Sequence, residues 1–250
     1  MSFDALLLAG SRPGADPLAA YAGVADKALI VIGGETMLSR VVAALRAAGA
    51  QRIVVAASSA AVADHARALG AETLPAAEGP SASVARGFAL LGAPLLVTTA
   101  DHALLRPEWV RRLIDETPAD ADVMALLARR EAIERDAPAT ARTYFRFADG
   151  AWSGCNLFYL ANPAASGAIT LWKQVETDRK RPWRIIRRLG PGVLLRYLLR
   201  RLTLTAAITR LGAFAGARIR IVESGSGLAA IDVDKPADLD LVRRLTSGAI

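Results

Sequence analysis

Residues 1–130 alternate short apolar runs with longer, alanine-rich amphipathic stretches, and this alternation restricts the fold more than any other feature of the chain. A strand, a helix and a second strand in succession form the repeating unit of a parallel sheet. The alternation therefore predicts a three-layer, Rossmann-like α/β fold with a mostly parallel sheet. The expected strands are Ala5–Ala9, Arg52–Ala57, Pro94–Thr99 and Val123–Ala128, and the expected helices are Thr36–Ala48, Ala60–Leu69, Ser81–Leu91 and Pro107–Glu116.

The pattern changes after Arg142. Thr143–Ala148 alternates with the period of two that is typical of a strand, Asp149-Gly150 favours a turn, and Asn156–Leu160 favours a second strand. We interpret this stretch as a hairpin-like addition to the sheet. Residues 163–212 then have helical character, interrupted at Pro182 and at Gly190-Pro191-Gly192, before a strand at Arg218–Glu223. We expect a parent domain of residues 1–162 and 218–250, with a helical insertion at residues 163–217.

Composition excludes several classes of protein. With 53% apolar and 22% charged residues, the chain can bury a sizeable core and is not disordered in bulk. One cysteine, Cys155, excludes an intrachain disulfide and a Cys-cluster zinc site, and two histidines cannot form a His-rich metal site. Asp4 stands where a signal peptide would carry positive charge, and no apolar run reaches the roughly 18 to 20 residues of a membrane span. We therefore expect a cytoplasmic protein.

The net charge of +7 is concentrated in one segment. Between Leu171 and Leu202 there are ten basic residues against Glu176 and Asp178, a local balance of +8, and the other 218 residues together carry −1. The positive charge is therefore not spread over the whole chain, as it would be for a diffuse basic surface. We expect no nucleic acid among the partners.

The turn after the first strand is a candidate anion-binding site. It contains Leu8-Ala9-Gly10-Ser11-Arg12-Pro13-Gly14, and Lys27 follows fifteen residues after Arg12. Backbone N–H groups of a glycine-containing turn can hold phosphate oxygens, and the two cations would add positive charge around the same anion. The alternative is an ordinary turn between a strand and a helix, with a solvated Arg12 and Lys27.

Acidic residues suggest a metal site. Asp101 follows an expected strand at the edge of the sheet where α/β proteins bind ligands, and a hard oxygen ligand there suits Mg²⁺; alternatively, Asp101 caps the next turn. Asp232 and Asp234 lie on one face of an extended segment, so either could supply a second carboxylate. One of the two could instead cap the expected last helix, Pro236–Leu245.

A run of small residues from Gly79 to Gly87 opens an expected helix and includes Ser83. Small side chains and hydroxyls there would let a flat base approach closely, although a plain helix start explains the same residues.

Six sequence motifs, taken together and in order, resemble those of one known protein family. They are LLLAGSRPG, DKALIVIGGETMLSRVVAALRAAGA, GPSASVARG, TTADHALL, SGCNLF and DVDKPADLDLV. In this order they resemble the MobA-like nucleotidyltransferases, a family with a GT-A-like fold, over residues 3–160 and 218–245. The resemblance implies an NTP on the first loop, at Leu8, Ala9, Gly10, Ser11, Arg12 and Gly14, with Arg12 and Lys27 on its phosphates. It further implies that Gly79 and Ser83 lie near the base, that Asp101 and Asp232 bind Mg²⁺, and that Gly154 and Asn156 bind the acceptor.

The expected reaction is Mg²⁺-dependent transfer of an NMP from an NTP to a phosphorylated small molecule or lipid headgroup, with release of pyrophosphate. An acceptor phosphate is already an anionic nucleophile, so no general base is required. A weak preference for CTP rests on the idea that a membrane-facing cytidylyltransferase could activate a lipid headgroup. The alternatives are a nucleotide-sugar-dependent glycosyltransferase and a non-catalytic peripheral membrane adaptor.

Two departures from the family pattern concern the phosphate grip, for the first loop, and the acceptor or location, for the basic insertion. The loop between Arg12 and Lys27 is longer than in many relatives, and the basic insertion has no counterpart in compact members. Basic and apolar residues recur at helical spacing in residues 181–212, so this segment could lie on an anionic membrane at the inner face. The alternative is a helical subdomain or a homodimer contact with solvated arginines. The residues concerned are Trp183, Arg184, Arg187, Arg188, Leu194, Leu195, Arg196, Tyr197, Leu198, Leu199, Arg200, Arg201 and Leu202.

Overall fold

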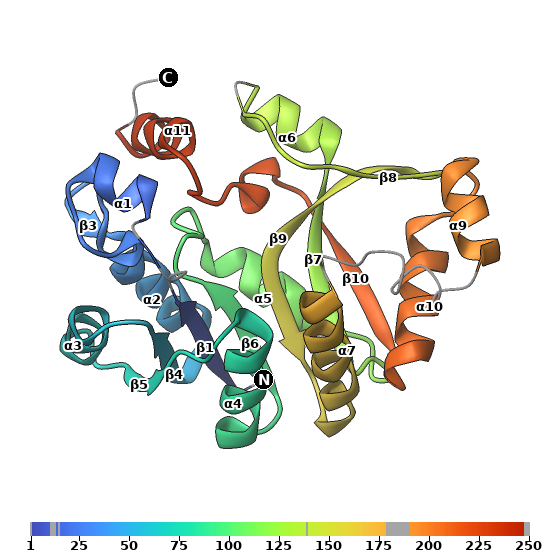
Figure 1. Ribbon diagram of the computed structural model, residues 1–250, viewed down its shortest axis with the longest axis horizontal. Coiled ribbons are helices and arrows are strands. Elements are labelled where there is room, and N and C mark those ends of the chain that lie inside the picture. The colour runs from blue at the N-terminus through green and yellow to red at the C-terminus, as the bar shows by residue number, and fades with distance from the viewer. Residues whose placement is uncertain (1, 11–13, 15, 139, 179–190, 248–250) are drawn as a thin grey trace.

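The computed structural model describes residues 2–10, 14, 16–138, 140–178 and 191–247. Its main sheet has the strand order β10-β7-β9-β6-β1-β4-β5, with β8 paired to β9 (Figure 1). The strands are β1 (Phe3–Ala9), β4 (Ala50–Ala57), β5 (Glu72–Pro75), β6 (Leu95–Thr99), β7 (Val123–Arg129), β8 (Phe145–Phe147), β9 (Gly150–Leu160) and β10 (Ile219–Ser224). The expected α/β fold with a mostly parallel sheet is confirmed.

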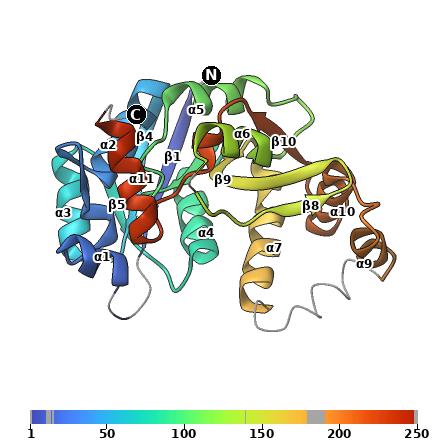
Figure 2. The same cartoon turned by 90° about the horizontal axis from the view of Figure 1, so that it is seen from above.

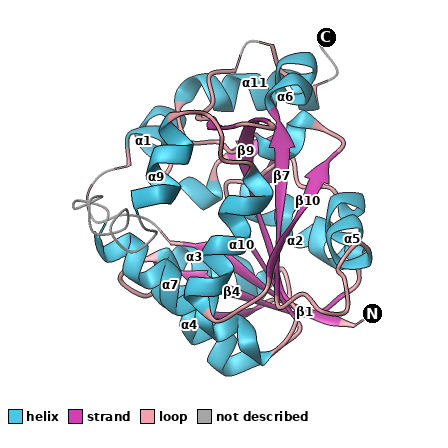
Figure 3. Cartoon of the chain, turned by 90° about the vertical axis from the view of Figure 1, so that its right-hand side faces the viewer, coloured by secondary structure: helices cyan, strands magenta, loops and turns pink. Residues whose placement is uncertain are grey.

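Helices cover both faces of this sheet. In Figure 3, α2 and α5 lie on one side of the strands and α4 and α7 on the other. The helices are α1 (Pro17–Ala22), α2 (Met37–Ala48), α3 (Ala60–Ala68), α4 (Pro80–Leu91), α5 (Pro107–Asp115), α6 (Arg130–Asp136), α7 (Ser166–Thr177), α9 (Pro191–Leu198), α10 (Leu204–Ala215) and α11 (Pro236–Thr246). Short 3-10 turns are η1 (Lys27–Leu29), η2 (Pro163–Ala165) and η4 (Gly227–Ala230), and β2 (Val31–Ile32) pairs with β3 (Glu35–Thr36).

Strand β1 explains why there are two cores. Its alternate residues Ala5 and Leu7 join the larger core with α2 and α5, whereas Leu6 and Leu8 join the smaller core with α4 and α7. Because side chains of a strand point alternately to opposite faces, a strand covered on both sides must be apolar throughout. The continuous apolar run in the sequence therefore reflects the central position of β1.

The hairpin differs from the expected one. Strand β8 pairs antiparallel with the start of β9, as the turn at Asp149-Gly150 predicts. However, β9 continues to Leu160 and lies antiparallel between β6 and β7, in the interior of the sheet. The expected hairpin-like addition to the sheet is therefore confirmed, although its second strand is longer than expected and lies in the interior of the sheet. Leu157 and Leu160 enter the two different cores, so this strand too is covered on both faces.

A bulge interrupts β9. Its pairing with β7 shifts between Ala125 and Leu127, and Asn156 has a left-handed backbone with φ 46° in this stretch. Asparagine tolerates that conformation better than most residues other than glycine. The bulge changes the direction of the Asn156 side chain, which matters for the site described below.

The segment that we expect to be an insertion, residues 163–217, is mostly helical in its described part. Helix α7 packs on the sheet through Trp172, whose ring lies 5.7 Å from that of Phe158. Gly167 lets α7 approach α10, since an added Cβ would lie 1.9 Å from the carbonyl oxygen of Ala215. Residues 179–190, and with them the first four arginines of the predicted membrane-facing segment 181–212, lie outside the described residues. Among the described residues, no helix has the length and hydropathy that a membrane span requires.

Candidate active site

The edge of the sheet at the carboxyl ends of β1 and β6 brings two acidic segments together. After β6, the N–H of Ala100 donates to the carbonyl of Leu8 at 2.9 Å, which holds the following turn against β1. The carbonyl of Asp101 then accepts the N–H of Val233 at 3.0 Å. This bond places Asp101 beside a segment from near the other end of the chain. Asp101 and Asp232, both expected from the sequence, therefore lie in one site.

Asp232 is 5% exposed, and both donors to its side chain reach the same oxygen. Its Oδ2 accepts hydrogen bonds from Asn156 Nδ2 at 2.8 Å and from Arg142 Nη2 at 3.0 Å. Arg142 also donates to the carbonyls of Asp232 and Ala230. The carboxylate is thus fixed in orientation by the bulge of β9 on one side and by Arg142 on the other.

The second oxygens of the two carboxylates have no such partners. Asp101 Oδ1 and Asp232 Oδ1 are buried, and no described residue donates a hydrogen bond to either. Burial and the nearby charge of Asp101 raise the pKa of Asp232 well above its usual range, while Arg142 opposes this rise. Two buried carboxylate oxygens without donors form a donor set that fits a hard divalent cation.

The site supplies fewer ligands than a closed metal cage. No group of three or more His, Cys, Asp or Glu side chains in the described part of the chain is arranged to hold a metal ion. Mg²⁺ usually keeps several waters and binds through one or two carboxylates together with substrate phosphates. The pair of aspartates fits this open mode of binding, in which a substrate completes the ligand set.

Lys27 lies between two acidic residues. Its Nζ donates to Asp101 Oδ2 at 2.8 Å and to Asp234 Oδ1 at 2.6 Å, and its side chain is only 18% exposed. Burial alone would lower the pKa of Lys27, but the carboxylates of Asp101 and Asp234 outweigh burial and raise it. The alternative of a solvated surface lysine is therefore wrong. Ser11 and Arg12 lie outside the described residues.

Asp232 and Asp234, which lie two residues apart before α11, have different environments. Asp232 is buried, whereas the side chain of Asp234 is 64% exposed and pairs with Lys27. The expectation that one of them caps the last helix is wrong. Asp238, in the first turn of α11, accepts the N–H groups of Asp234 and Lys235, both at 3.2 Å. A carboxylate at the third helical position reaches back to the start of the helix, so no cap from Asp232 or Asp234 is required.

The expected nucleotide-binding segments meet at the same edge. Gly10, after β1, lies against the loop that follows β5, since an added Cβ would contact Ala76 at 3.6 Å. The N–H of Ala77, in that loop, donates to the hydroxyl of Ser83, in α4, at 2.9 Å. Ser83 is 3% exposed. Leu8 and Ala9 have buried side chains at the end of β1. Gly14 has φ 109°, and Gly79 directly precedes α4.

A family model described as MobA-like NTP transferase domain matches residues 5–208. The chain belongs to this family. It is accordingly a nucleotidyltransferase, which favours nucleotidyl transfer over the glycosyltransferase and adaptor alternatives.

Solved structures agree on the fold of this MobA-like transferase. A hypothetical transferase from Thermus thermophilus has 31% sequence identity and a TM-score of 0.82, over 96% of this chain and 100% of that one. A CMP:2-keto-3-deoxy-manno-octonic acid synthetase complexed with CTP has 18% identity and a TM-score of 0.62, with both chains fully covered. A Mycobacterium tuberculosis protein in complex with manganese has 18% identity and a TM-score of 0.51, over 97% of each chain. No protein of curated function matches significantly.

Two residues that contact the candidate site or its expected nucleotide-binding segments were not predicted from the sequence. Arg142 holds Asp232, and Glu176 of α7 contacts the start of α4. Both act on residues far away in the chain, and neither belongs to a local motif. The sequence does contain one weak indication for Arg142, because it stands where the strand and helix pattern of the first half ends.

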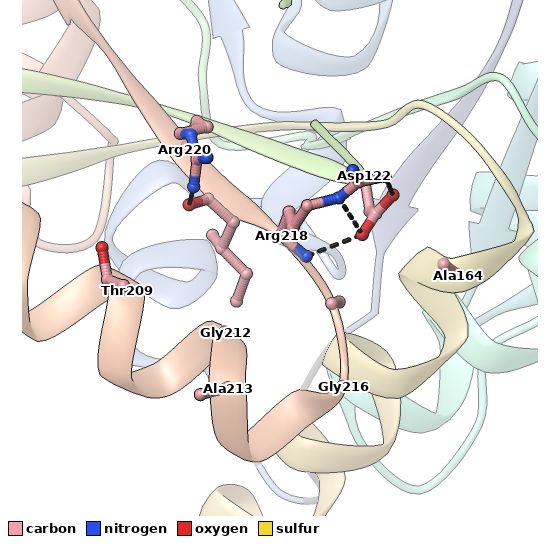
Figure 4. A pocket seen from close by; sticks show the side chains of 10 residues that line it. Asp122, Ala164, Thr209, Gly212, Ala213, Gly216, Arg218 and Arg220 are labelled. Atoms are coloured by element: carbon pink, nitrogen blue, oxygen red, sulfur yellow. Dashed lines mark hydrogen bonds and ion pairs between the residues drawn. The ribbon is translucent and has the colours of Figure 1, made fainter. Parts of the chain in front are cut away.

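A cavity of about 580 Å³ lies away from this edge of the transferase (Figure 4). It is lined by α10 and by the residues around the start of β10, including Arg218 and Arg220. Asp122, on its wall, directly precedes β7, so the cavity is at the amino ends of β7 and β10. Ligands of open α/β sheets bind at the carboxyl ends of strands. We therefore assign the candidate active site to the acidic cluster rather than to this cavity.

Proposed function

We propose that this nucleotidyltransferase transfers an NMP from an NTP, with CTP preferred, to a phosphorylated small molecule or lipid headgroup and releases pyrophosphate. The observation that carries the proposal is the pair of buried oxygens, Asp101 Oδ1 and Asp232 Oδ1, without hydrogen-bond donors among the described residues and beside Lys27. The likeness to a synthetase complexed with CTP supports the preference for that nucleotide. The preference also agrees with activation of a lipid headgroup.

Asp101 and Asp232 would hold Mg²⁺, the cofactor of the proposed reaction. The related structure in complex with manganese supports a divalent cation as the cofactor. When bound, such a cation supplies positive charge that neutralises phosphate oxygens and stabilises charge in the transition state. Arg142 and Asn156 keep Asp232 in one orientation, with Oδ2 occupied by their hydrogen bonds.

Lys27 provides the cationic side chain that the transferred phosphate requires. Its ammonium is held by Asp101 and Asp234 and carries its charge firmly, because both neighbours raise its pKa. A positioned ammonium that is already desolvated stabilises charge on the α-phosphate and on the departing pyrophosphate. In this proposal Arg12 acts on the same phosphates, and backbone groups of Leu8, Ala9, Gly10, Ser11 and Gly14 hold them.

The proposed acceptor site lies along β9, at Gly154 and Asn156. An added Cβ at Gly154 would meet nothing within 4 Å, so the backbone there is open on that side. The acceptor phosphate attacks the α-phosphorus, and the bond from that phosphorus to the bridging oxygen of pyrophosphate breaks. No base has to remove a proton. Cys155 and His102 have no part in this step: burial raises the pKa of the Cys155 thiol and lowers that of His102 to about 4.

We further propose that residues 163–217 form an insertion and that its residues 181–212 dock on an anionic membrane at the inner face. Leu195, Leu198 and Leu199 expose 55 to 67% of their surface on and just after α9. Arg196, Arg200 and Arg201 are also exposed. Exposed apolar side chains among arginines are typical of interfacial helices. The alternatives remain a helical subdomain and a homodimer contact.

The transfer is tested by measuring pyrophosphate release with each of the four NTPs, Mg²⁺ and a panel of phosphorylated sugars, alcohols and lipid headgroup precursors. We expect release with CTP that depends on both the metal and an acceptor. Asp120→Asn serves as the control, because Asp120 is an exposed partner of Arg220 at the amino ends of the strands. Absence of release with every NTP and acceptor class would overturn the proposal.

A further inference from the structure

Glu176 connects the insertion to the proposed nucleotide site. Helices α4 and α7 lie side by side (Figures 1 and 2), and Glu176 is in the last turn of α7. Its Oε2 accepts the N–H of Ser81, in the first turn of α4, at 3.1 Å. Its other oxygen, Oε1, lies against Gly79, where an added Cβ would be 2.0 Å away. Any side chain at position 79 would displace this carboxylate.

The carboxylate takes the place of a missing N-cap. Gly79 occupies the N-cap position of α4 and has no side chain to accept the N–H groups of the first turn. Glu176 supplies an acceptor from a distant element. Only one of its two oxygens is needed for this bond, so Oε1 is available for a second donor.

The position of Glu176 relative to the proposed NTP follows from a series of contacts. Gly10, after β1, lies against Ala76, and Ala77 is fixed by the hydroxyl of Ser83 in the first turns of α4. The same first turn contacts Glu176. The loop expected to hold phosphates and the segment expected to hold the base are thus neighbours, and Glu176 lies at the far side of the base segment.

We propose that Glu176 discriminates between the two pyrimidine NTPs by selecting CTP, which carries an exocyclic amino group, over UTP, which does not. This inference rests on the proposed function. A carboxylate only accepts hydrogen bonds. It can accept an N–H of the 4-amino group of cytosine, but it would face the 4-oxo group of uracil with one acceptor against another. A buried acceptor pair without a proton between them is unfavourable, so CTP binds and UTP is rejected.

The substitution that tests this role is Glu176→Gln. The amide oxygen of glutamine can still accept the N–H of Ser81, so the cap of α4 remains. Its NH₂ group can donate to the 4-oxo group of uracil, which a carboxylate cannot do. A role in capping alone predicts weaker or unchanged binding of both nucleotides to the same degree, whereas a role in base recognition predicts a change in their ratio.

The measurement is calorimetric titration of the full chain with CTP, UTP, ATP or GTP in the presence of Mg²⁺ and without acceptor. We expect wild-type protein to bind CTP more tightly than UTP and Glu176→Gln to reduce that ratio by about tenfold to a hundredfold, as for loss of a hydrogen bond to a charged group. Glu116→Gln removes an exposed carboxylate of α5, on the opposite face of the sheet, and should leave the ratio unchanged. Melting curves of the three proteins report whether the cap of α4 is intact.

The outcomes separate this inference from the proposed function. Equal binding of CTP and UTP by wild-type protein overturns the role of Glu176 and the preference for CTP, and leaves the proposed transfer of an NMP intact. An unchanged ratio in Glu176→Gln, or binding of a purine NTP alone, does the same. Binding of no NTP by the wild-type protein overturns both.

Discussion

Asp232 shows how a single carboxylate can be held firmly and still be available to a cation. Arg142 and Asn156 donate to one oxygen and leave the other without a donor from the described residues. Fixing a ligand through one oxygen removes the entropy cost of ordering it when the cation binds. At the scale of single residues, the site is therefore organised before any ligand arrives.

Removal of the charge from either Asp101 or Asp232 should abolish transfer. Asp101→Asn and Asp232→Asn preserve shape but weaken binding of a hard cation, so we expect pyrophosphate release to fall by about two orders of magnitude or more. Asp234→Asn should have a milder effect, because Asp234 is mostly exposed and contacts Lys27. Rates are compared at saturating Mg²⁺, with circular dichroism as the check on folding. Near-normal turnover of Asp101→Asn would contradict the assigned site.

Lys27→Ala should impair catalysis more than stability. The ammonium interacts most strongly as charge moves toward pyrophosphate, so we expect kcat/KM to fall about a hundredfold. The exposed Lys173 of α7 provides the control variant Lys173→Ala. Urea unfolding of both variants measures the change in the free energy of unfolding. An unchanged kcat/KM for Lys27→Ala would show that its two ion pairs are only structural.

Arg142 is a positioning residue that can be tested through metal affinity. Its side chain is 10% exposed and donates to Asp232 Oδ2 and to two carbonyls of the same segment. Arg142→Gln should weaken Mn²⁺ binding, measured by calorimetry, by about tenfold to a hundredfold, the usual range for partners of metal ligands. Arg142→Lys should recover part of the affinity. If Mn²⁺ binds both variants as it binds wild-type protein, the orientation of Asp232 does not depend on Arg142.

Some residues of the candidate site could be predicted from the sequence, and others could not. Asp101, Lys27 and Asp232 stand at the ends of local patterns and could be named before the structure was known. Arg142 and Glu176 could not, since each acts on residues more than sixty positions away and leaves no periodicity nearby. A long-range hydrogen bond imposes no pattern on its neighbours in the chain.

At the scale of secondary-structure elements, the Asp122 carboxylate connects the ends of three strands, β7, β9 and β10. Asp122, before β7, accepts from the backbone and side chain of Arg218, before β10, and from Asn162, after β9. The hydrogen bonds from Arg218 lower the pKa of Asp122 to about 2. The folded-state pKa is below the unfolded value, so this stabilisation is present above about pH 4 and is lost as the pH falls toward 2.

Asp122→Asn should therefore flatten the pH dependence of stability. We expect a loss of about 1 kcal/mol in the free energy of unfolding at neutral pH, a value reduced for the exposure of the Arg218 side chain. The difference from wild-type protein should shrink as the pH falls from about 4 to about 2. Urea unfolding across this range is the measurement, with Asp120→Asn as the control. A difference that stays constant with pH would show that Asp122 acts through packing alone.

The prediction of elements succeeded where a strand is buried on both faces. β1, β4, β6 and β7 are apolar runs and were found within a few residues. β5 was missed because Glu72–Pro75 is short, lies at the sheet edge and is only partly buried, so its residues carry little hydrophobic pattern. The position of β9 between β6 and β7 was missed for another reason. A periodicity identifies a strand but does not name its neighbours.

At the scale of the whole molecule, the two ends differ in character. Helix α9 lies at the opposite end of the molecule from α1 and α3 (Figures 1 and 2), with its Leu195, Arg196 and Leu198 exposed. If this end docks on a bilayer, anionic vesicles should sediment the protein at low salt and release much of it at high salt, because each basic residue near the surface contributes about 1 kcal/mol. Leu195→Ser with Leu198→Ser should reduce binding. Equal sedimentation with neutral vesicles would contradict docking by charge.

The hydrogen bond from Val233 to the carbonyl of Asp101 also has a consequence for the order of synthesis. During synthesis Asp101 leaves the ribosome early, after strands β1, β4, β5 and β6 of the parallel sheet. Asp232 leaves it only after residues 163–217 and β10. Closing so long a loop is slow compared with local contacts. The sheet can therefore form as a folded but inactive core, and the nascent enzyme acquires its proposed metal site in one of the last steps of folding.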